Sequence, residues 1–273
     1  MKTIRKSVIA GSWYPGNPDV LRRDIEGYFR SAAEIKFDGD IMAIVAPHAG
    51  YIYSGQIAAQ AYKLICGKRY DTVVIIGPSH RVAFHGVSVY PEGGYQTPLG
   101  IVRIDEAFAH EISSLSKVVH NIPAAHLQEH SIEIQLPFLQ VALGEFSFVP
   151  LVMGDQDENI CWELAQAIKH VARERKILVV GSSDLSHFHN YQEAAKLDAV
   201  AIKRLEEVDA EGLLKCLSDH STEACGGGPM AVAMLVARKM GAIKSKVLKY
   251  ANSGDISGDK SSVVGYVSAV YYQ

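Results

Sequence analysis

Short apolar runs alternate with longer amphipathic segments along almost the whole sequence, and this alternation constrains the fold more than any other feature. The runs, which we expect to be strands, cover residues 42–46, 72–76, 87–90, 146–152, 176–180, 246–250 and 263–271. Apolar residues recur at three- and four-residue spacing, as in amphipathic helices, over 55–66, 157–175, 191–208, 209–219 and 228–241. Continuous apolar strands that alternate with helices indicate a mostly parallel sheet covered on both faces. We therefore predict an α/β fold, a single three-layer αβα domain over residues 1–273.

Local signals support several of the expected helices. Asp157 and Asp209 precede amphipathic segments and are suitable N-caps, and Gly241 follows Met240 where a helix should stop. The chain contains neither a low-complexity linker nor a repeat of fixed period. These observations favour one domain over two.

Composition excludes several classes of function. The 27 basic and 30 acidic residues give a net charge of -3, without a block of Lys or Arg that would follow a phosphate backbone, so we expect no nucleic-acid partner. No apolar run approaches the roughly 20 residues of a membrane span, and the first hydrophobic stretch is too short for a secretory signal. We expect a cytoplasmic protein. Four cysteines, Cys66, Cys161, Cys216 and Cys225, lie at wide, irregular spacing, which indicates neither a disulfide framework nor a zinc knuckle.

Histidines follow directly after the ends of predicted strands. DIMAIVAPHAG places His48 after one strand, and DTVVIIGPSH places His80 after another. A third strand runs into a polar loop with Ser182, Ser183, Asp184, Ser186, His187 and His189. The carboxyl ends of parallel strands share one edge of a sheet, and ligands bind in the crevice outside that edge. The sequence thus predicts a histidine-rich crevice, although each histidine alone is equally consistent with a capping or surface position.

Histidines grouped with Asp and Cys suggest a metal site, because neutral imidazole is the commonest ligand for zinc, copper, iron and nickel. In STEACGGGPMAVAM, Cys225 precedes three glycines and a predicted helix. A thiol at a helix N-terminus has a lowered pKa and favours the metal-binding thiolate. The alternative is a glycine-rich turn with an inert cysteine.

A rival constellation is HLQEHSIE, residues 126–133. His126 and His130 lie four residues apart with Glu129 between them, which matches the HxxEH pattern of inverted zincins. Pro123 and Pro137 would keep such a helix short, so a purely structural role, or a role in supporting the other histidines, is favoured over a zinc hydrolase.

Other catalytic motifs do not occur in the sequence. It contains no GxGxxG after a strand, no Walker A lysine and no GxSxG elbow. Dinucleotide, nucleotide and serine-hydrolase functions are therefore disfavoured.

Several spaced motifs in one order, APHAGYIYSG, GPSH, EHSIEIQLPFL, SSDLSHF and the Cys225 glycine turn, resemble the Memo family. The resemblance runs from SWYPG at residues 12–16 to the last strand. The family includes the Memo component of the prokaryotic AmmeMemoRadiSam gene system. Memo proteins are in turn similar to the LigB-type class III extradiol dioxygenases, which cleave catechol rings with non-haem Fe(II). The resemblance implies a LigB-dioxygenase-like α/β fold.

The resemblance also implies a set of site residues. His48, His80 and Cys225 would be the metal ligands, with His187 as an acid/base and Asp184 orienting it. The third ligand is a carboxylate in the dioxygenases, whereas here it would be a thiolate, which prefers softer metals and is itself oxidisable. Fe(II) is the expected metal, with copper or zinc as alternatives, and ring cleavage does not transfer with the fold.

The same resemblance places His130, Trp13 and Tyr51 in or beside the cleft. It leaves two functions open. One is an iron- or copper-dependent redox enzyme that acts on a small molecule. The other is a non-catalytic module that retains the cleft and binds a peptide, as implied by phosphotyrosine-peptide binding in the family, or a partner protein of the AmmeMemoRadiSam system.

Overall fold

The sheet at the centre of the fold is mixed, with parallel strands in its middle. The computed structural model describes residues 3–35, 37, 39–242 and 244–273. Within these residues a 12-stranded sheet has the order β1-β5-β6-β8-β3-β9-β2-β12-β10, with β11 paired to β12, and β4 joining β8 to β7. The strands are β1 Ile4–Arg5, β2 Ile41–Ala46, β3 Thr72–Pro78, β4 Val87–Val89, β5 Gly94–Thr97, β6 Gly100–Ile104, β7 Val119–His120, β8 Ser147–Met153, β9 Ile177–Ser182, β10 His187–His189, β11 Lys244–Asn252 and β12 Val263–Tyr272.

The parallel strands bring their carboxyl ends to one edge. Strand β9 pairs in parallel with β2 on one side, where Ala46 faces Ser182, and with β3 on the other, where Ile76 faces Gly181. Every residue of these three strands is buried, which explains their continuous apolar sequence. Strand β12 then runs antiparallel to β2 and makes the sheet mixed. The predicted α/β fold with a mostly parallel central sheet is confirmed.

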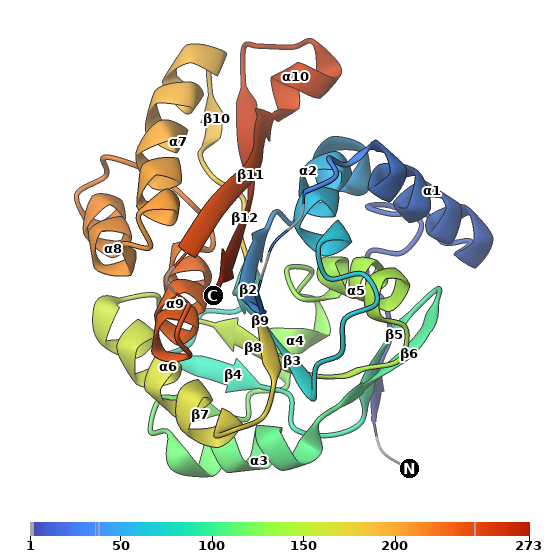
Figure 1. Ribbon diagram of the computed structural model, residues 1–273, viewed down its shortest axis with the longest axis vertical. Coiled ribbons are helices and arrows are strands. Elements are labelled where there is room, and N and C mark those ends of the chain that lie inside the picture. Colours follow the sequence, from blue (N-terminus) through green and yellow to red (C-terminus); the bar gives the residue numbers. More distant parts are fainter. Residues whose placement is uncertain (1–2, 36, 38, 243) are drawn as a thin grey trace.

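Helices flank the sheet in two groups (Figure 1). Helices α1, α2 and α5 pack together on one side of the central strands, and α6, α8 and α9 pack together on the other. The helices are α1 Pro18–Ser31, α2 Tyr51–Lys63, α3 Glu106–Leu115, α4 Ala124–Leu127, α5 Leu136–Leu143, α6 Glu158–Ala172, α7 Tyr191–Glu206, α8 Ala210–Ser218, α9 Gly227–Lys239 and α10 Ser253–Ser257, with a 3₁₀ turn, η1, at Glu133–Gln135. The three layers place α9 against β2, β3 and β9, directly under the shared edge.

The predicted helix ends are also observed. The side chain of Asp157 caps α6 by accepting the N–H of Ile160, and Asp209 caps α8 by accepting the N–H of Gly212. Gly241 follows α9 with φ +95°, a conformation that glycine adopts without strain. That residues 1–273 form a single domain stays a prediction, and it includes residues 1–2, 36, 38 and 243, which lie outside the described residues.

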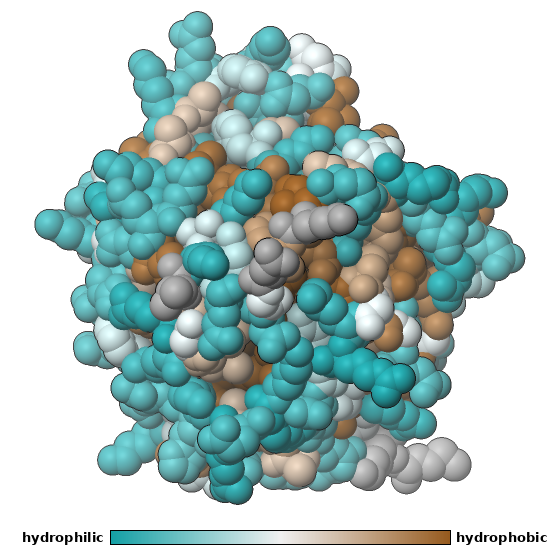
Figure 2. Space-filling view, in the orientation of Figure 1, coloured by the Kyte–Doolittle hydropathy of each residue, from teal (hydrophilic) through white to brown (hydrophobic). Residues whose placement is uncertain are grey.

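The surface is mostly polar. Figure 2 shows hydrophilic side chains over most of the face seen in Figure 1, with hydrophobic ones mainly between them. Among the described residues, no helix is both long enough and apolar enough to cross a membrane.

Candidate metal centre

Three side chains from distant parts of the sequence converge at the shared edge of the sheet. His48 follows β2, His80 follows β3, and Cys225 precedes α9. One ligand atom from each, a ring nitrogen or the thiol sulfur, lies within 4.8 Å of the other two. The structure thus brings together the three residues for which the sequence suggested metal binding.

The ring of His48 is buried and held through its Nδ1. The hydroxyl of Ser182 donates to the carbonyl of Ser131 at 2.6 Å and accepts the side-chain amide of Gln135 at 2.7 Å. Its second lone pair is left to accept the Nδ1–H of His48 at 3.1 Å. This arrangement leaves the lone pair of His48 on Nε2, which lies 3.1 Å from Sγ of Cys225. The Cys225 thiol can therefore donate its proton to this nitrogen, at the position where a metal ion would join the two atoms.

The ring of His80 is also held through its Nδ1, in this case by Glu129. Oε1 of Glu129 lies 2.9 Å from Nδ1 of His80, and Oε2 accepts the backbone N–H of His80 at 2.6 Å. Burial opposes the charge on Glu129, but the hydrogen bonds and charge of His80 outweigh it and lower the pKa of Glu129 to about 2. The ionised carboxylate fixes the Nδ1–H form of His80 and leaves Nε2 as its metal-binding nitrogen.

The loop that carries Cys225 is anchored from two sides. The N–H of Gly226 donates to Oγ of Ser183, at the end of β9, at 2.9 Å. The amide of Gln156 bridges the loop, because it donates to the carbonyl of Cys225 at 2.9 Å and accepts the N–H of Gly228 at 2.8 Å. These bonds fix the loop so that the thiol points toward His48. No side chain of the helix itself caps the N-terminus of α9.

The expected low pKa of the Cys225 thiol is not observed. Helix α9 begins at Gly227, so Cys225 lies before the first turn, and burial and the nearby Asp184 raise the pKa of the thiol. Without a cation the group is a neutral thiol. A bound metal ion would reverse this preference, because a coordinating thiol loses its proton.

Asp184 and His187 lie beside the three ligands, but they do not form the expected pair. Oδ1 of Asp184 accepts the backbone N–H of His48 at 2.8 Å, and burial raises the pKa of Asp184 to about 7. Burial lowers the pKa of His187, and in the described residues no hydrogen bond joins its ring to Asp184. The carboxyl of Asp184 instead holds the backbone of His48.

Two of the three residues expected in or beside the cleft, His130 and Trp13, form its wall. The ring of His130 stacks on His80 at 4.5 Å between centroids, and the ring of Trp13, tilted by 52°, lies 4.3 Å from that of His130. Burial lowers the pKa of His130 to about 4. Tyr51 instead packs in the core against Phe138, and its backbone N–H donates to the carbonyl of Trp13 at 2.8 Å.

These residues enclose a cleft of about 470 Å³. The polar groups that line it are His48, His80, His130, Asp184 and His187. The apolar and aromatic groups that line it are Trp13, Ile52, Tyr53, Val264 and Tyr266. A largely apolar cleft with a few convergent polar groups is typical of a small-molecule site.

The rival zinc site on His126 and His130 is not formed. Helix α4 spans only Ala124–Leu127, so the two histidines do not share a helical face. Nε2 of His126 lies 2.9 Å from Oγ of Ser88, and its Nδ1 lies 2.7 Å from the hydroxyl of Tyr95. His126 is a buried structural residue, in line with the preference for a structural or supporting role over the rival zinc hydrolase.

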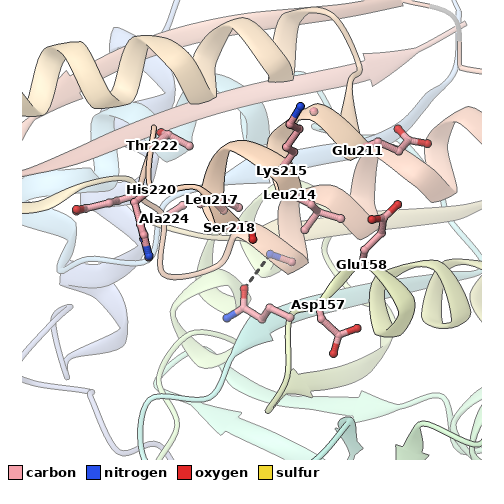
Figure 3. A pocket seen from close by; sticks show the side chains of 15 residues that line it. Asp157, Glu158, Glu211, Leu214, Lys215, Leu217, Ser218, His220, Thr222 and Ala224 are labelled. Atoms are coloured by element: carbon pink, nitrogen blue, oxygen red, sulfur yellow. Dashed lines mark hydrogen bonds between the residues drawn. The ribbon is translucent and has the colours of Figure 1, made fainter.

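Glu223, the carboxylate nearest to Cys225 in sequence, turns away from the three ligands. Its Oε2 lies 2.9 Å from Nε2 of His189. Glu223 also lines a separate hollow of about 880 Å³, between the Cys225 loop and α8 (Figure 3). The dashed line in Figure 3 is the hydrogen bond from Gly228 to Gln156 that forms part of its wall.

The supporting residues Glu129, Ser182 and Gln156 were not assigned these roles from the sequence. The strand-end loop signalled Ser182, and the HxxEH pattern drew attention to Glu129, although for another chemistry. Nothing in the sequence singled out Gln156.

Together, the fold and the site define a class: α/β proteins with a histidine-lined cleft at the carboxyl edge of a mostly parallel sheet, and a cysteine thiol within reach of two of the histidines. The chain belongs to the Memo-like protein family, whose profile matches residues 5–270. It is 39% identical to a MEMO1 family protein of Methanopyrus kandleri, over 98% of both chains. It is 35% identical to a MEMO1 family protein of Nitrosopumilus maritimus, over 96% of this chain and 98% of that one.

A solved structure supports the fold. The chain resembles an uncharacterized protein of Escherichia coli K12 with a TM-score of 0.57, over 85% of this chain and 99% of that chain. The two sequences are 15% identical, so this likeness concerns the fold alone.

Proposed function

We propose that this protein is a metal-dependent redox protein whose dioxygenase-like cleft holds an iron or copper ion through His48, His80 and Cys225. The observation that carries the proposal is the 3.1 Å approach of Nε2 of His48 to Sγ of Cys225, with His80 as the third member of the cluster. Both imidazoles are held in the form that leaves Nε2 for a metal, so the donor set fits such an ion.

The donor set bears on the choice of metal. Two imidazoles and a thiolate suit iron, copper and zinc, and the thiolate favours the softer of these ions. We propose Fe(II), with copper or zinc as alternatives that elemental analysis of the metal present in the purified protein, before any loading, distinguishes. A reduced thiolate ligand also agrees with a cytoplasmic location, where thiols are kept reduced.

The residues around the proposed ion would transfer protons and contact the substrate. When bound, iron or copper supplies a Lewis acid and a one-electron redox couple. Asp184, with its pKa raised to about 7, can hold or release a proton near neutral pH. His187, with its pKa lowered by burial, is neutral at that pH and can accept one. The rings of Trp13 and His130, tilted by 52° to each other, exclude water from this side of the cleft and offer aromatic faces to a planar substrate.

The test is elemental analysis of protein purified without oxygen or chelator. Wild-type protein loaded with iron, copper or zinc should hold about one ion per chain, and Cys225→Ser and His80→Ala should lose it. The described residues contain two groups of side chains that could hold a metal ion, His48 with His80 and Cys225, and His80 with Glu129 and His130. His126→Gln is the matched control and should keep the ion, because His126 belongs to neither group. Wild-type protein that stays metal-free after anaerobic loading would contradict the proposal.

A second candidate function is a non-catalytic module that binds a peptide or a partner protein of the AmmeMemoRadiSam system at the cleft. The exposed apolar side chains beside the cleft support it. Ile52 is 74% exposed, and Phe188, which adjoins His187, is 77% exposed. Phe188 also has φ +65°, a strained conformation for a residue with a side chain. Exposed apolar groups near a cleft favour binding of another chain.

Turnover separates the two candidates. Metal-loaded protein that consumes O₂ in the presence of a catechol, and loses this activity in His187→Gln, is an enzyme. Protein that binds catechol without consuming O₂ supports the binding module.

A further inference from the structure

A second hollow adjoins the metal cleft at Trp13. It measures about 520 Å³ and shares Ser12, Trp13 and His130 with the cleft as wall residues. Arg81 and Gln128 line its other side. A ligand in the cleft could therefore extend past Trp13 into this second space, which we call the Arg81 hollow.

The Arg81 hollow is positively charged. Arg81 is the one residue with a full charge at neutral pH among those that line it, and no carboxylate does so. In the part of the chain that the structure describes, Arg81 is in no ion pair. Of the other ten arginines, five are paired with carboxylates, namely Arg5, Arg173, Arg175, Arg204 and Arg238, and five are in no ion pair among the described residues, namely Arg22, Arg23, Arg30, Arg69 and Arg103. Among the unpaired arginines, Arg81 is the one that lines the hollow beside the metal cleft. The guanidinium of Arg81 thus keeps its donors available for an anion from outside the chain.

Arg81 is also close to the metal cluster. It follows His80 directly in the sequence. It lines the Arg81 hollow together with His130, whose ring stacks on His80 at 4.5 Å between centroids. Arg81 therefore lies beside the residues that the two hollows share.

We propose that the Arg81 hollow is an anion subsite that binds the carboxylate of a substrate whose other end lies at His48, His80 and Cys225. The inference rests on the proposed function and adds the charge of the substrate to it. A guanidinium binds a carboxylate through two parallel hydrogen bonds, and Gln128 adds an amide donor. The single cationic side chain matches one negative charge. The flat faces of Trp13 and His130 suit a planar group between the two ends.

The test compares ligands that differ only in the carboxylate. Catechol and 3,4-dihydroxybenzoate are titrated into metal-loaded protein, with the fluorescence of Trp13 as the readout. Trp162, on α6, is replaced by Phe throughout, because Trp13 and Trp162 are the two tryptophans in the sequence. The subsite predicts that the benzoate binds roughly tenfold to a hundredfold more tightly than catechol.

Substitutions of Arg81 test whether this residue causes the preference for 3,4-dihydroxybenzoate over catechol. Arg81→Gln should bring the ratio of the two affinities close to one without loss of metal, and Arg81→Lys should keep part of it. Arg103→Gln is the matched control, because Arg103 is an exposed arginine on β6 that lines another hollow. Equal affinities in the parent protein, or a preference that survives in Arg81→Gln, would overturn the proposal.

Metal-free protein separates this inference from the metal assignment. Benzoate and benzyl alcohol need no metal, and the same ratio is measured with them. A preference for benzoate that Arg81→Gln removes supports the subsite even where no metal binds. Absence of that preference in metal-free and metal-loaded protein counts against the subsite alone.

Discussion

The carboxylate of Glu129 accepts two hydrogen bonds from His80, one from the backbone N–H at 2.6 Å and one from Nδ1 at 2.9 Å. Two residues further on, the carbonyl of Ser131 accepts the hydroxyl of Ser182, which faces Nδ1 of His48. One short segment, 129–131, therefore orients both imidazoles. It does so through an ionised carboxylate for His80 and a neutral hydroxyl for His48.

Replacing Glu129 with Gln should weaken metal binding by roughly tenfold to a hundredfold, the usual effect of removing a partner of a ligating histidine. The amide retains the shape of the carboxylate but not its charge, so the Nδ1–H form of His80 loses its preference. The measurement is competition with a chelator of known affinity. Glu223→Gln, which removes a carboxylate bonded to His189 instead, should leave the affinity unchanged. Equal losses in both variants would refute the role of Glu129.

Close packing between β3 and the segment 129–131 gives a second prediction. A Cβ on Gly77 would lie 2.4 Å from Oγ and 2.9 Å from Cβ of Ser131. Gly77→Ala should therefore lower the free energy of unfolding by about 1–3 kcal/mol, as overpacking does, and should also weaken metal binding. Urea unfolding measures the first effect.

The control for this prediction is a compensating substitution. Ser131→Gly removes both clashing atoms, so the double variant should be more stable than the two single changes predict by about 1 kcal/mol or more. Gly27→Ala, on α1 with a nearest contact at 3.7 Å, should instead stabilise the protein by about 0.5–1 kcal/mol. If the changes in the free energy of unfolding caused by Gly77→Ala and Ser131→Gly were strictly additive in the double variant, the predicted contact would be absent.

The central strands and the position of His48 and His80 could be predicted because parallel strands constrain both. An apolar run followed by a polar loop identifies a buried strand and also places the loop at the carboxyl edge of the sheet. This prediction requires no knowledge of contacts between distant residues. The α1 and α5 helices could not be found in this way. Only Leu21 and Ile25 of α1 are buried, so its apolar signal is weak. Pro137 suggests a helix break, but it lies in the first turn of α5, where proline is tolerated.

The support of the site depends on contacts between distant residues, which explains why the sequence did not predict it. The guanidinium of Arg5 donates to the carbonyls of His126 and Glu129 at 2.6 and 2.5 Å. These contacts span more than a hundred residues and fix a segment that spacing alone would make helical. The direction of the Glu129 side chain follows from that path of the backbone.

The buried pair of Arg5 and Glu133 gives a third prediction. The two side chains meet at 2.5 Å and are almost fully buried. Arg5→Met leaves Glu133 charged and unpaired, and should lower the free energy of unfolding by about 3–5 kcal/mol. Arg173→Met breaks an exposed pair with Glu111 and should cost at most about 1 kcal/mol. Similar losses in the two variants, measured by urea unfolding, would contradict the role of the buried pair.

A pH dependence of stability follows from His126. Burial, followed by the charge of Arg5, lowers the pKa of His126 from its ordinary 6.5 to about 3. Between these values the unfolded chain binds a proton that the folded chain does not. The stabilisation from neutral His126 is therefore complete above pH 6.5 and is lost as the pH falls toward 3, by about 1.4 kcal/mol for each unit.

Urea unfolding of wild type and His126→Gln between pH 7.5 and 4.5 tests this contribution. Glutamine does not titrate, so the variant should lose stability less steeply as the pH falls, although His130 still contributes a decline of its own because its pKa is lowered to about 4. The control is His170→Gln, near the end of α6 on its exposed side, which should keep the wild-type slope. Identical slopes in wild type and His126→Gln would mean that His126 is protonated in the folded chain. Its bonds to Ser88 and Tyr95 would then have to be reassigned, because a protonated ring donates from both nitrogens.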